Sequence, residues 1–367
     1  MKYLAILIGI LLVVPVYGQR KKTDEEVVPT YIEGVVYALP RTVIRVQVKT
    51  LKETFIPGPY SGYAQQLLGI SNVKTRSVTS WSITDVKIEG GSEPDPAQVY
   101  KAMGEGAFLI SLTSDGCIAG VNTGSIDVDP IKLKTNKLIK KPDTDDGFSF
   151  DYFTDTPFYT AGDSTNNFRP VRVSDDQKMA EAAKRVLESR RMQYDMVSGM
   201  MDEFHPDGEA YKLSLKELKN IEKKYLSLFV GRTTYSEHVF SVDFVPGKAG
   251  NKGEVIFRIS DENGVVPASD LSGKPVMIEF ENEDALVQKA SQLAKSDNPV
   301  AGESGVYYRI PGISNVKIIN DLKVIATARI PVAQFGTVAP VPEDMLLGDY
   351  VIKFHPETGA IASIEKK

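Results

Sequence analysis

From Gly231 to its last residue, the chain alternates apolar and polar side chains in short segments, and this pattern constrains the fold more than any other feature. Segments 239–245, 254–260 and 276–280 place an apolar residue at every second position. A period of two is typical of a strand with one buried face. Asn263-Gly264 follows one segment as a hairpin signal. Residues 231–367 therefore predict a C-terminal β-rich domain with a sandwich or barrel-like sheet.

The same alternation marks an N-terminal β-rich domain over residues 27–127. Segments 41–49 and 73–88 predict strands, and residues 60–69 between them predict a short helix that Gly69 ends. Further along, Pro94 and Pro96 predict the start of a short helix through residues 99–103, because proline favours the first helical turn. The last element of this domain is a predicted hairpin over residues 108–121, with Asp115-Gly116 at its turn.

Two different kinds of segment separate these domains. Residues 128–172 carry dense charge with little periodicity, which predicts a polar linker or long loop. Residues 173–230 carry apolar side chains at spacings of three and four, with a break at Pro206-Asp-Gly208, and predict a central antiparallel helical hairpin. The expected fold class is α+β, mainly antiparallel β-sheet domains with that central hairpin.

The N-terminus has the features of an export signal. Lys2 precedes an apolar run over residues 4–14, and Gly18 follows as a small residue suited to cleavage. This arrangement is typical of a secretory signal peptide, here residues 1–18. The run is too short to cross a hydrocarbon core about 30 Å thick. We therefore expect an exported protein, periplasmic, outer-membrane associated or extracellular, with no transmembrane span in the mature chain.

Composition limits the partners and the sources of stability. The formal net charge is −5 over 367 residues, so no basic excess suggests a nucleic-acid partner. Cys117 is the only cysteine, which excludes an intrachain disulfide. Its place after Asp115-Gly116 favours a small buried strand residue over a reactive thiol. Stability must therefore come from packed cores, for which 42% hydrophobic residues provide ample material.

No catalytic, cofactor-binding or metal-binding constellation emerges from the residues. The three histidines, His205, His238 and His355, lie in separate contexts, whereas zinc sites need three or four ligands at characteristic spacings. The acidic run at residues 143–147 does not match an EF-hand loop. The sequence thus names no catalytic residue, metal or cofactor, and it favours a non-enzymatic role.

Aromatic side chains in loops are the remaining functional indication. Tyr60 and Tyr63 follow the loop sequence Pro57-Gly-Pro, and further aromatic residues lie within 148–158. Such rings can stack on a sugar or a partner protein. Tyr60 and Tyr63 are accordingly the candidates for ligand or partner contact. Their spacing of three residues also fits the packed face of a short helix, and that interpretation is favoured.

Several strings along the chain resemble those of a family of exported proteins of unknown function from Bacteroidetes-type bacteria. They include YALPRTVIRV at 37–46, PGPYSGYAQQLLG at 57–69, the helical stretch 207–231, FRIS at 257–260, VYYRIP at 306–311, IPVAQFG at 330–336 and FHPETG at 354–359. The resemblance covers most of the mature chain. It implies an envelope-associated protein of a Gram-negative cell, and it brings no active-site residues.

Three function hypotheses follow. The first is a non-catalytic cell-envelope binding or structural component that contacts an envelope protein or a glycan. The second is a polysaccharide-acting hydrolase with a scattered carboxylate pair, which requires a cleft lined by two carboxylates. The third is secretion-system cargo, suggested by the terminal residues 348–367. The sequence leaves the oligomeric state open.

Overall fold

The computed structural model describes residues 34–103, 109–124, 148–151, 174–200, 208–247, 253–283, 285–294, 305–346 and 349–367. The predicted signal peptide and most of the predicted linker lie outside these residues. The described part is an α+β protein built mainly from antiparallel sheets, so the expected fold class is confirmed.

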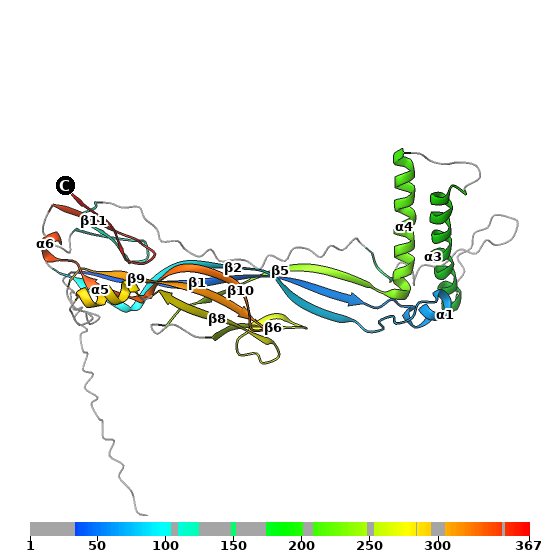
Figure 1. Ribbon diagram of the computed structural model, residues 1–367, viewed down its shortest axis with the longest axis horizontal. Coiled ribbons are helices and arrows are strands. Elements are labelled where there is room, and N and C mark those ends of the chain that lie inside the picture. Colours follow the sequence, from blue (N-terminus) through cyan, green and yellow to red (C-terminus); the bar gives the residue numbers. More distant parts are fainter. Residues whose placement is uncertain are drawn as a thin grey trace, which may run out of the picture.

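The described chain consists mainly of strands, several of them long, with few helices (Figure 1). The strands are β1 (Val35–Ile56), β2 (Val78–Ala102), β3 (Ile110–Leu112), β4 (Ile118–Val121), β5 (Arg232–Phe244), β6 (Glu254–Ser260), β7 (Gly264–Pro267), β8 (Lys274–Glu283), β9 (Tyr307–Asn320), β10 (Lys323–Pro340), β11 (Tyr350–Phe354) and β12 (Ile361–Lys366). The helices are η1 (Ser61–Tyr63), α1 (Ala64–Leu68), α3 (Asp175–Ser198), α4 (Gly208–Val230), α5 (Ala285–Ala294) and α6 (Glu343–Leu346).

An antiparallel pair, β1 and β2, runs along the molecule as its spine (Figure 1). The pairing extends from Val35 opposite Ala102 to Phe55 opposite Val78. Such length gives the protein an elongated shape, with α3 and α4 at one end and β11 and α6 at the other.

The described strands form three sheets, with orders β2-β1-β5, β10-β9-β8-β6-β7 and β12-β11-β4-β3. Two of these sheets combine strands from before and after the helices. β5 pairs with β1 over Ile44–Ile56, and β11 pairs with β4 at Ile352 and Val121. The strands of the ranges 27–127 and 231–367 therefore share hydrogen-bonded sheets.

Three hydrophobic cores follow one another along the spine. In the middle core, Ile44, Val46 and Val48 of β1 pack against the five-stranded sheet, including Val276 and Ile278 of β8. Each fully buried aliphatic side chain of this kind stabilises the fold by about 1.5–3 kcal/mol relative to its exposed state.

The second core, the sheet-end core, joins the first residues of β1 to the four-stranded sheet. Tyr37 and Leu39 pack there with Ile118 of β4 and Ile352 of β11. The third, the helix-end core, lies beyond the other end of β1 and contains Tyr60, Ala64, Met179, Ala182, Ala183, Leu228 and Phe229. One strand pair thus links all three cores.

The predicted short helix after Pro94 and Pro96 is wrong, because β2 continues as a strand to Ala102. Pro94 lies opposite Pro40 in β1, beside a register irregularity between Ala38 and Pro40. β2 is an edge strand, since only β1 pairs with it within its sheet. Proline lacks an N–H donor and is tolerated at such edges.

Other local predictions are confirmed. α1 ends at Gly69, which has φ 70° as a left-handed C-cap requires. The Asp115-Gly116 turn joins β3 to β4, and Asn263 ends the turn after β6, directly before Gly264 begins β7. Cys117 is buried directly after the Asp115-Gly116 turn, with 3% of its surface exposed.

Helices α3 and α4 lie within the range 173–230 and stand side by side at one end of the molecule (Figure 1). The first turns of α3 contribute Met179 and Ala183 to the core that holds Leu228 and Phe229 from the last turn of α4. Because the start of one helix meets the end of the other, the two helices run antiparallel. The pair is central in sequence but terminal in space.

Candidate functional site

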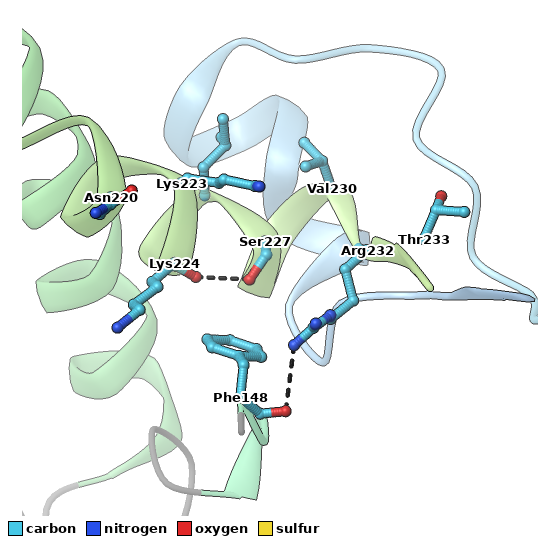
Figure 2. Close-up of a pocket in the computed structure, with 10 residues that line it drawn as sticks. Phe148, Asn220, Lys223, Lys224, Ser227, Val230, Arg232 and Thr233 are labelled. Atoms are coloured by element: carbon cyan, nitrogen blue, oxygen red, sulfur yellow. Dashed lines mark hydrogen bonds between the residues drawn. The ribbon is translucent and has the colours of Figure 1, made fainter. Parts of the chain in front are cut away.

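A cavity of about 360 Å³ lies at the base of α4, where that helix turns into β5 (Figure 2). We call it the helix-end cavity. Its lining comes from the last turns of α4, the first residues of β5 and the short segment 148–151. The lining residues are Phe148, Asn220, Lys223, Lys224, Leu226, Ser227, Val230, Gly231, Arg232 and Thr233.

Gly231 makes the turn from helix to strand. Its φ of 80° is left-handed, and its N–H donates to the Ser227 carbonyl at 2.9 Å. A Cβ at this position would lie 2.5 Å from the Ile56 carbonyl oxygen and 2.6 Å from the Phe55 ring. Only glycine fits both the conformation and the space. The close turn sets Arg232 and Thr233 directly beside the end of α4.

Arg232 holds the segment 148–151 against the cavity. Its Nη1 donates to the Phe148 carbonyl at 3.2 Å, and its guanidinium lies 4.7 Å from the centroid of the Phe148 ring (Figure 2). A cation over an aromatic face is stabilised by the ring quadrupole. Phe148 also meets Phe150 edge to face at 5.3 Å. Phe148 therefore forms an aromatic wall of the cavity.

The charge of the lining is positive. Lys223, Lys224 and Arg232 are its ionised groups, and both lysines are exposed to solvent. The described lining residues include no carboxylate, histidine or cysteine. The polar side chains of Asn220, Ser227 and Thr233 complete it, with the Ser227 Oγ donating to the Lys224 carbonyl at 2.6 Å. Such a surface suits an anionic or polar ligand better than acid–base catalysis.

The two tyrosines predicted for ligand or partner contact lie near this cavity but not in its lining. Tyr60 is 7% exposed, its ring lies 5.7 Å from that of Phe229, and its N–H donates to the Leu228 carbonyl at 2.8 Å. Tyr63 is 45% exposed. Tyr60 thus packs under the helix end, and contact through Tyr63 stays a prediction.

Sequence reasoning found one lining residue and missed the cations. Phe148 belongs to the aromatic stretch 148–158, of which the structure describes 148–151. Lys223-Lys224 and Arg232 were visible as basic residues around Gly231. Nothing in the sequence indicates that a left-handed turn at Gly231 brings them to one cavity.

A second cavity, the acidic cavity, has a volume of about 500 Å³ and is lined by Asp85, Asp261 and Asp321 together with Trp81. Asp85 pairs with Lys49 at 3.4 Å, and Asp321 pairs with Lys274 at 3.5 Å. The Trp81 Nε1 donates to the Glu262 carbonyl at 3.1 Å. Two of the three carboxylates are thereby engaged by lysines.

Among the described residues, no cluster of three or more histidine, cysteine, aspartate or glutamate side chains could hold a metal ion. His205 lies outside those residues, and the ring of His238 lies 4.9 Å from that of Trp81. In the part of the chain that the structure describes, no helix has the length and apolar character needed to span a membrane.

Comparison with known proteins places the chain in a family without assigning its function. Neither a curated protein nor a solved structure matches it. One family model matches residues 33–362, which include the helix-end cavity and every described strand except most of β12. The chain therefore belongs to the family described as Domain of unknown function (DUF4831).

Proposed function

We propose that this protein is an exported, non-catalytic component of the cell envelope that binds an acidic glycan at the helix-end cavity. Export rests on the leader pattern of residues 1–18 and on the family resemblance of the sequence. That resemblance also suggests a Gram-negative envelope, with the protein in the periplasm or at the outer membrane.

The observation that carries the binding role is the lining of the helix-end cavity. Three cations surround a space of about 360 Å³, and one wall is the ring of Phe148. Carboxylate or phosphate groups form charge-assisted hydrogen bonds with such cations, and a sugar face can pack on an aromatic ring. The amide of Asn220 and the hydroxyl of Thr233 add hydrogen-bonding groups for sugar hydroxyls.

The elongated architecture supports a structural or bridging role alongside binding. Helix α4, whose last turns line the helix-end cavity, and the four-stranded sheet lie at opposite ends of the β1–β2 spine (Figure 1). The paired strands β1 and β2 separate these two ends. The protein could thus hold a glycan at one end while the other contacts a second envelope component.

The test is the binding of the purified protein to polygalacturonate, an acidic polysaccharide, and to neutral dextran. We expect saturable binding to polygalacturonate that weakens as salt rises, because screening reduces attraction between exposed charges. The variant Lys224→Ala should bind about tenfold more weakly, since hydrogen bonds to charged groups contribute about 1.5–3 kcal/mol.

Lys219→Ala is the matched control. Lys219 lies on the same helix and is exposed, but it does not line the cavity. Its loss should leave affinity within about twofold, as expected for an exposed charge outside the cavity lining. Equal affinity of the Lys224 and Lys219 variants, or equal binding to dextran and polygalacturonate, would contradict the proposal.

An acid-pair hydrolase is the second candidate, because the acidic cavity places three carboxylates and Trp81 around one space. This candidate requires hydrolysis of a polysaccharide that is lost in Asp85→Asn and Asp261→Asn. A panel of acidic and neutral polysaccharides that yields no reducing ends would exclude it.

A further inference from the structure

Arg309 of β9 is a buried cation whose hydrogen-bonding capacity is only partly used. The residue is 3% exposed, and its Nη2 donates to the Asp95 Oδ2 at 3.2 Å. Its Nε and Nη1 are buried and have no hydrogen-bond partner among the described residues. A buried charge left with unmet donors is costly, so this arrangement requires an explanation.

Other arginines of the protein show how the same group is satisfied elsewhere. Arg45 donates from Nε and Nη2 to the two carboxylate oxygens of Asp243, each at 2.6 Å. Arg329 donates in the same way to Glu283, each at 2.9 Å. Both are two-point pairs along one edge of the guanidinium. Arg309 makes a single contact instead, although it is more deeply buried than either of them.

The electrostatic balance around Arg309 also indicates that the buried guanidinium lacks a second interaction partner. Burial lowers the pKa of Arg309 and outweighs the opposing hydrogen bond and charge of Asp95. One carboxylate therefore does not fully compensate the desolvated cation. A second anion beside the guanidinium would supply the missing interaction.

A cavity of about 500 Å³ borders Arg309, and we call it the Arg309 cavity. It lies where β2, β9 and β10 meet, beside the end of β5, and Asp95 and Arg41 also line it. Arg41 is a second cation, 29% exposed at its side chain and paired with Glu93. The cavity thus has one buried cation and one partly exposed cation.

One wall of this cavity is fixed by hydrogen bonds between β10 and β1. Between Val332 and Thr337 the pairing of β10 with β9 is interrupted, and Gln334 turns to β1 instead. Its Oε1 accepts from the Thr42 N–H at 2.9 Å, and its Nε2 donates to the Thr42 carbonyl at 2.8 Å. These two side-chain hydrogen bonds hold β10 against β1 where its backbone pairing with β9 is interrupted. A cavity with a fixed wall is organised before any ligand arrives.

We propose that the Arg309 cavity binds a small ligand bearing a carboxylate or phosphate group, with Arg309 as its buried anchor and Arg41 at its rim. The Nη2 contact with Asp95 leaves Nε on one edge of the guanidinium and Nη1 on the other. An anion that reaches either edge gains a charge-assisted hydrogen bond that the protein alone does not provide. This site is distinct from the helix-end cavity and independent of the function proposed there.

The experiment titrates the full protein with inorganic phosphate and, separately, with malonate, and follows thermal unfolding and heat of binding. At least one anion should raise Tm in a saturable manner, as a ligand of the native state must. Response to phosphate alone or to malonate alone identifies the ligand chemistry, and glycerol serves as the neutral control.

The variant Arg309→Met should abolish the response, and Arg41→Gln should weaken it about tenfold, in keeping with loss of one charge-assisted contact. Because Arg309→Met removes the ion-pair partner of Asp95, the double variant Arg309→Met/Asp95→Asn provides a second test in a fold without the buried charges. Lys224→Ala should respond as the wild type does, which separates this site from the helix-end cavity.

Three results would overturn the proposal. The first is the absence of a saturable response to both anions. The second is an unchanged response in the double variant. The third is a crystal structure grown in phosphate or malonate that shows only ordered water at Nε and Nη1, since bridging water would then satisfy the buried donors.

Discussion

At the residue scale, Gly231 controls how the helix-end cavity is formed. Gly231→Ala should lower the free energy of unfolding by about 2–5 kcal/mol, combining about 1–2 for the left-handed backbone with about 1–3 for overpacking against Ile56 and Phe55. Urea denaturation measures this loss.

Gly116→Ala is the matched control, because Gly116 has φ 82° and nothing within 4 Å of a built Cβ. Its cost should be the backbone contribution alone, about 1–2 kcal/mol. Equal losses in the two variants would show that the close contact at Gly231 does not constrain the turn.

Cys117 should be chemically inert in the native protein. Burial, followed by the nearby charge of Asp115, raises the pKa of its thiol to about 11, so little thiolate is present at neutral pH. Iodoacetamide at pH 7.5 should leave the folded protein unlabelled and label it fully in concentrated urea. Rapid labelling without urea would contradict the buried position.

At the candidate site, the sequence predicts which types of residue could bind a ligand but not which of them come together. Tyr60 and Tyr63 were singled out because loop aromatics can bind ligands, yet Tyr60 packs against Phe229. Phe148, from a charged stretch without periodicity, lines the cavity. Composition identifies aromatic and basic residues as candidates. Only tertiary contacts decide which of them reach one space.

At the element scale, Glu222 ties α4 to α3. Arg190 donates to one Glu222 carboxylate oxygen at 2.7 Å, and Gln193 donates to the other at 2.9 Å. Burial alone would raise the pKa of Glu222, but these hydrogen bonds and the charge of Arg190 outweigh it, and the net shift is downward.

A carboxylate with a lowered pKa stabilises the fold above its unfolded-state pKa, and this contribution is lost as pH falls through its folded-state pKa. Glu222→Gln should therefore destabilise the helix pair by about 1 kcal/mol at pH 7. The difference from wild type should shrink at acid pH, below the lowered folded-state pKa of Glu222, where both side chains are neutral. Hydrogen exchange of α3 and α4 amides at both pH values checks this, and a difference that grows toward low pH would contradict it.

Elements with strong local signals were predictable, and elements decided by pairing were not. Helical spacing predicted α3 and α4, Gly69 predicted the end of α1, and Asn263-Gly264 predicted the turn from β6 to β7. Pro94 and Pro96 misled because the local rule favours a helix start. The edge position of β2 tolerates them, and sequence periodicity does not show which strands become edges.

At the scale of the whole molecule, distant pairing decides the architecture. Alternation predicts that strands exist in 27–127 and in 231–367, but it carries no information about their partners. β1 pairs with β5 from beyond the helices, and β4 pairs with β11 near the C-terminus. The common sheets and the elongated spine therefore emerged only from the structure.

This elongation is measurable in solution. β1 has 22 residues, which at about 3.3 Å per residue gives a strand about 70 Å long. A compact chain of this length would have a radius of gyration of about 20 Å. Small-angle X-ray scattering of the monomer should give a value well above this. A value near 20 Å across a dilution series would contradict the extended spine.

The proposed envelope role is tested most directly by fractionating the cells that make this protein and sequencing its N-terminus. The account predicts recovery from the envelope or periplasmic fraction, with Gln19 as the first residue after cleavage at Gly18. An intact chain beginning at Met1 and confined to the cytosol would contradict it.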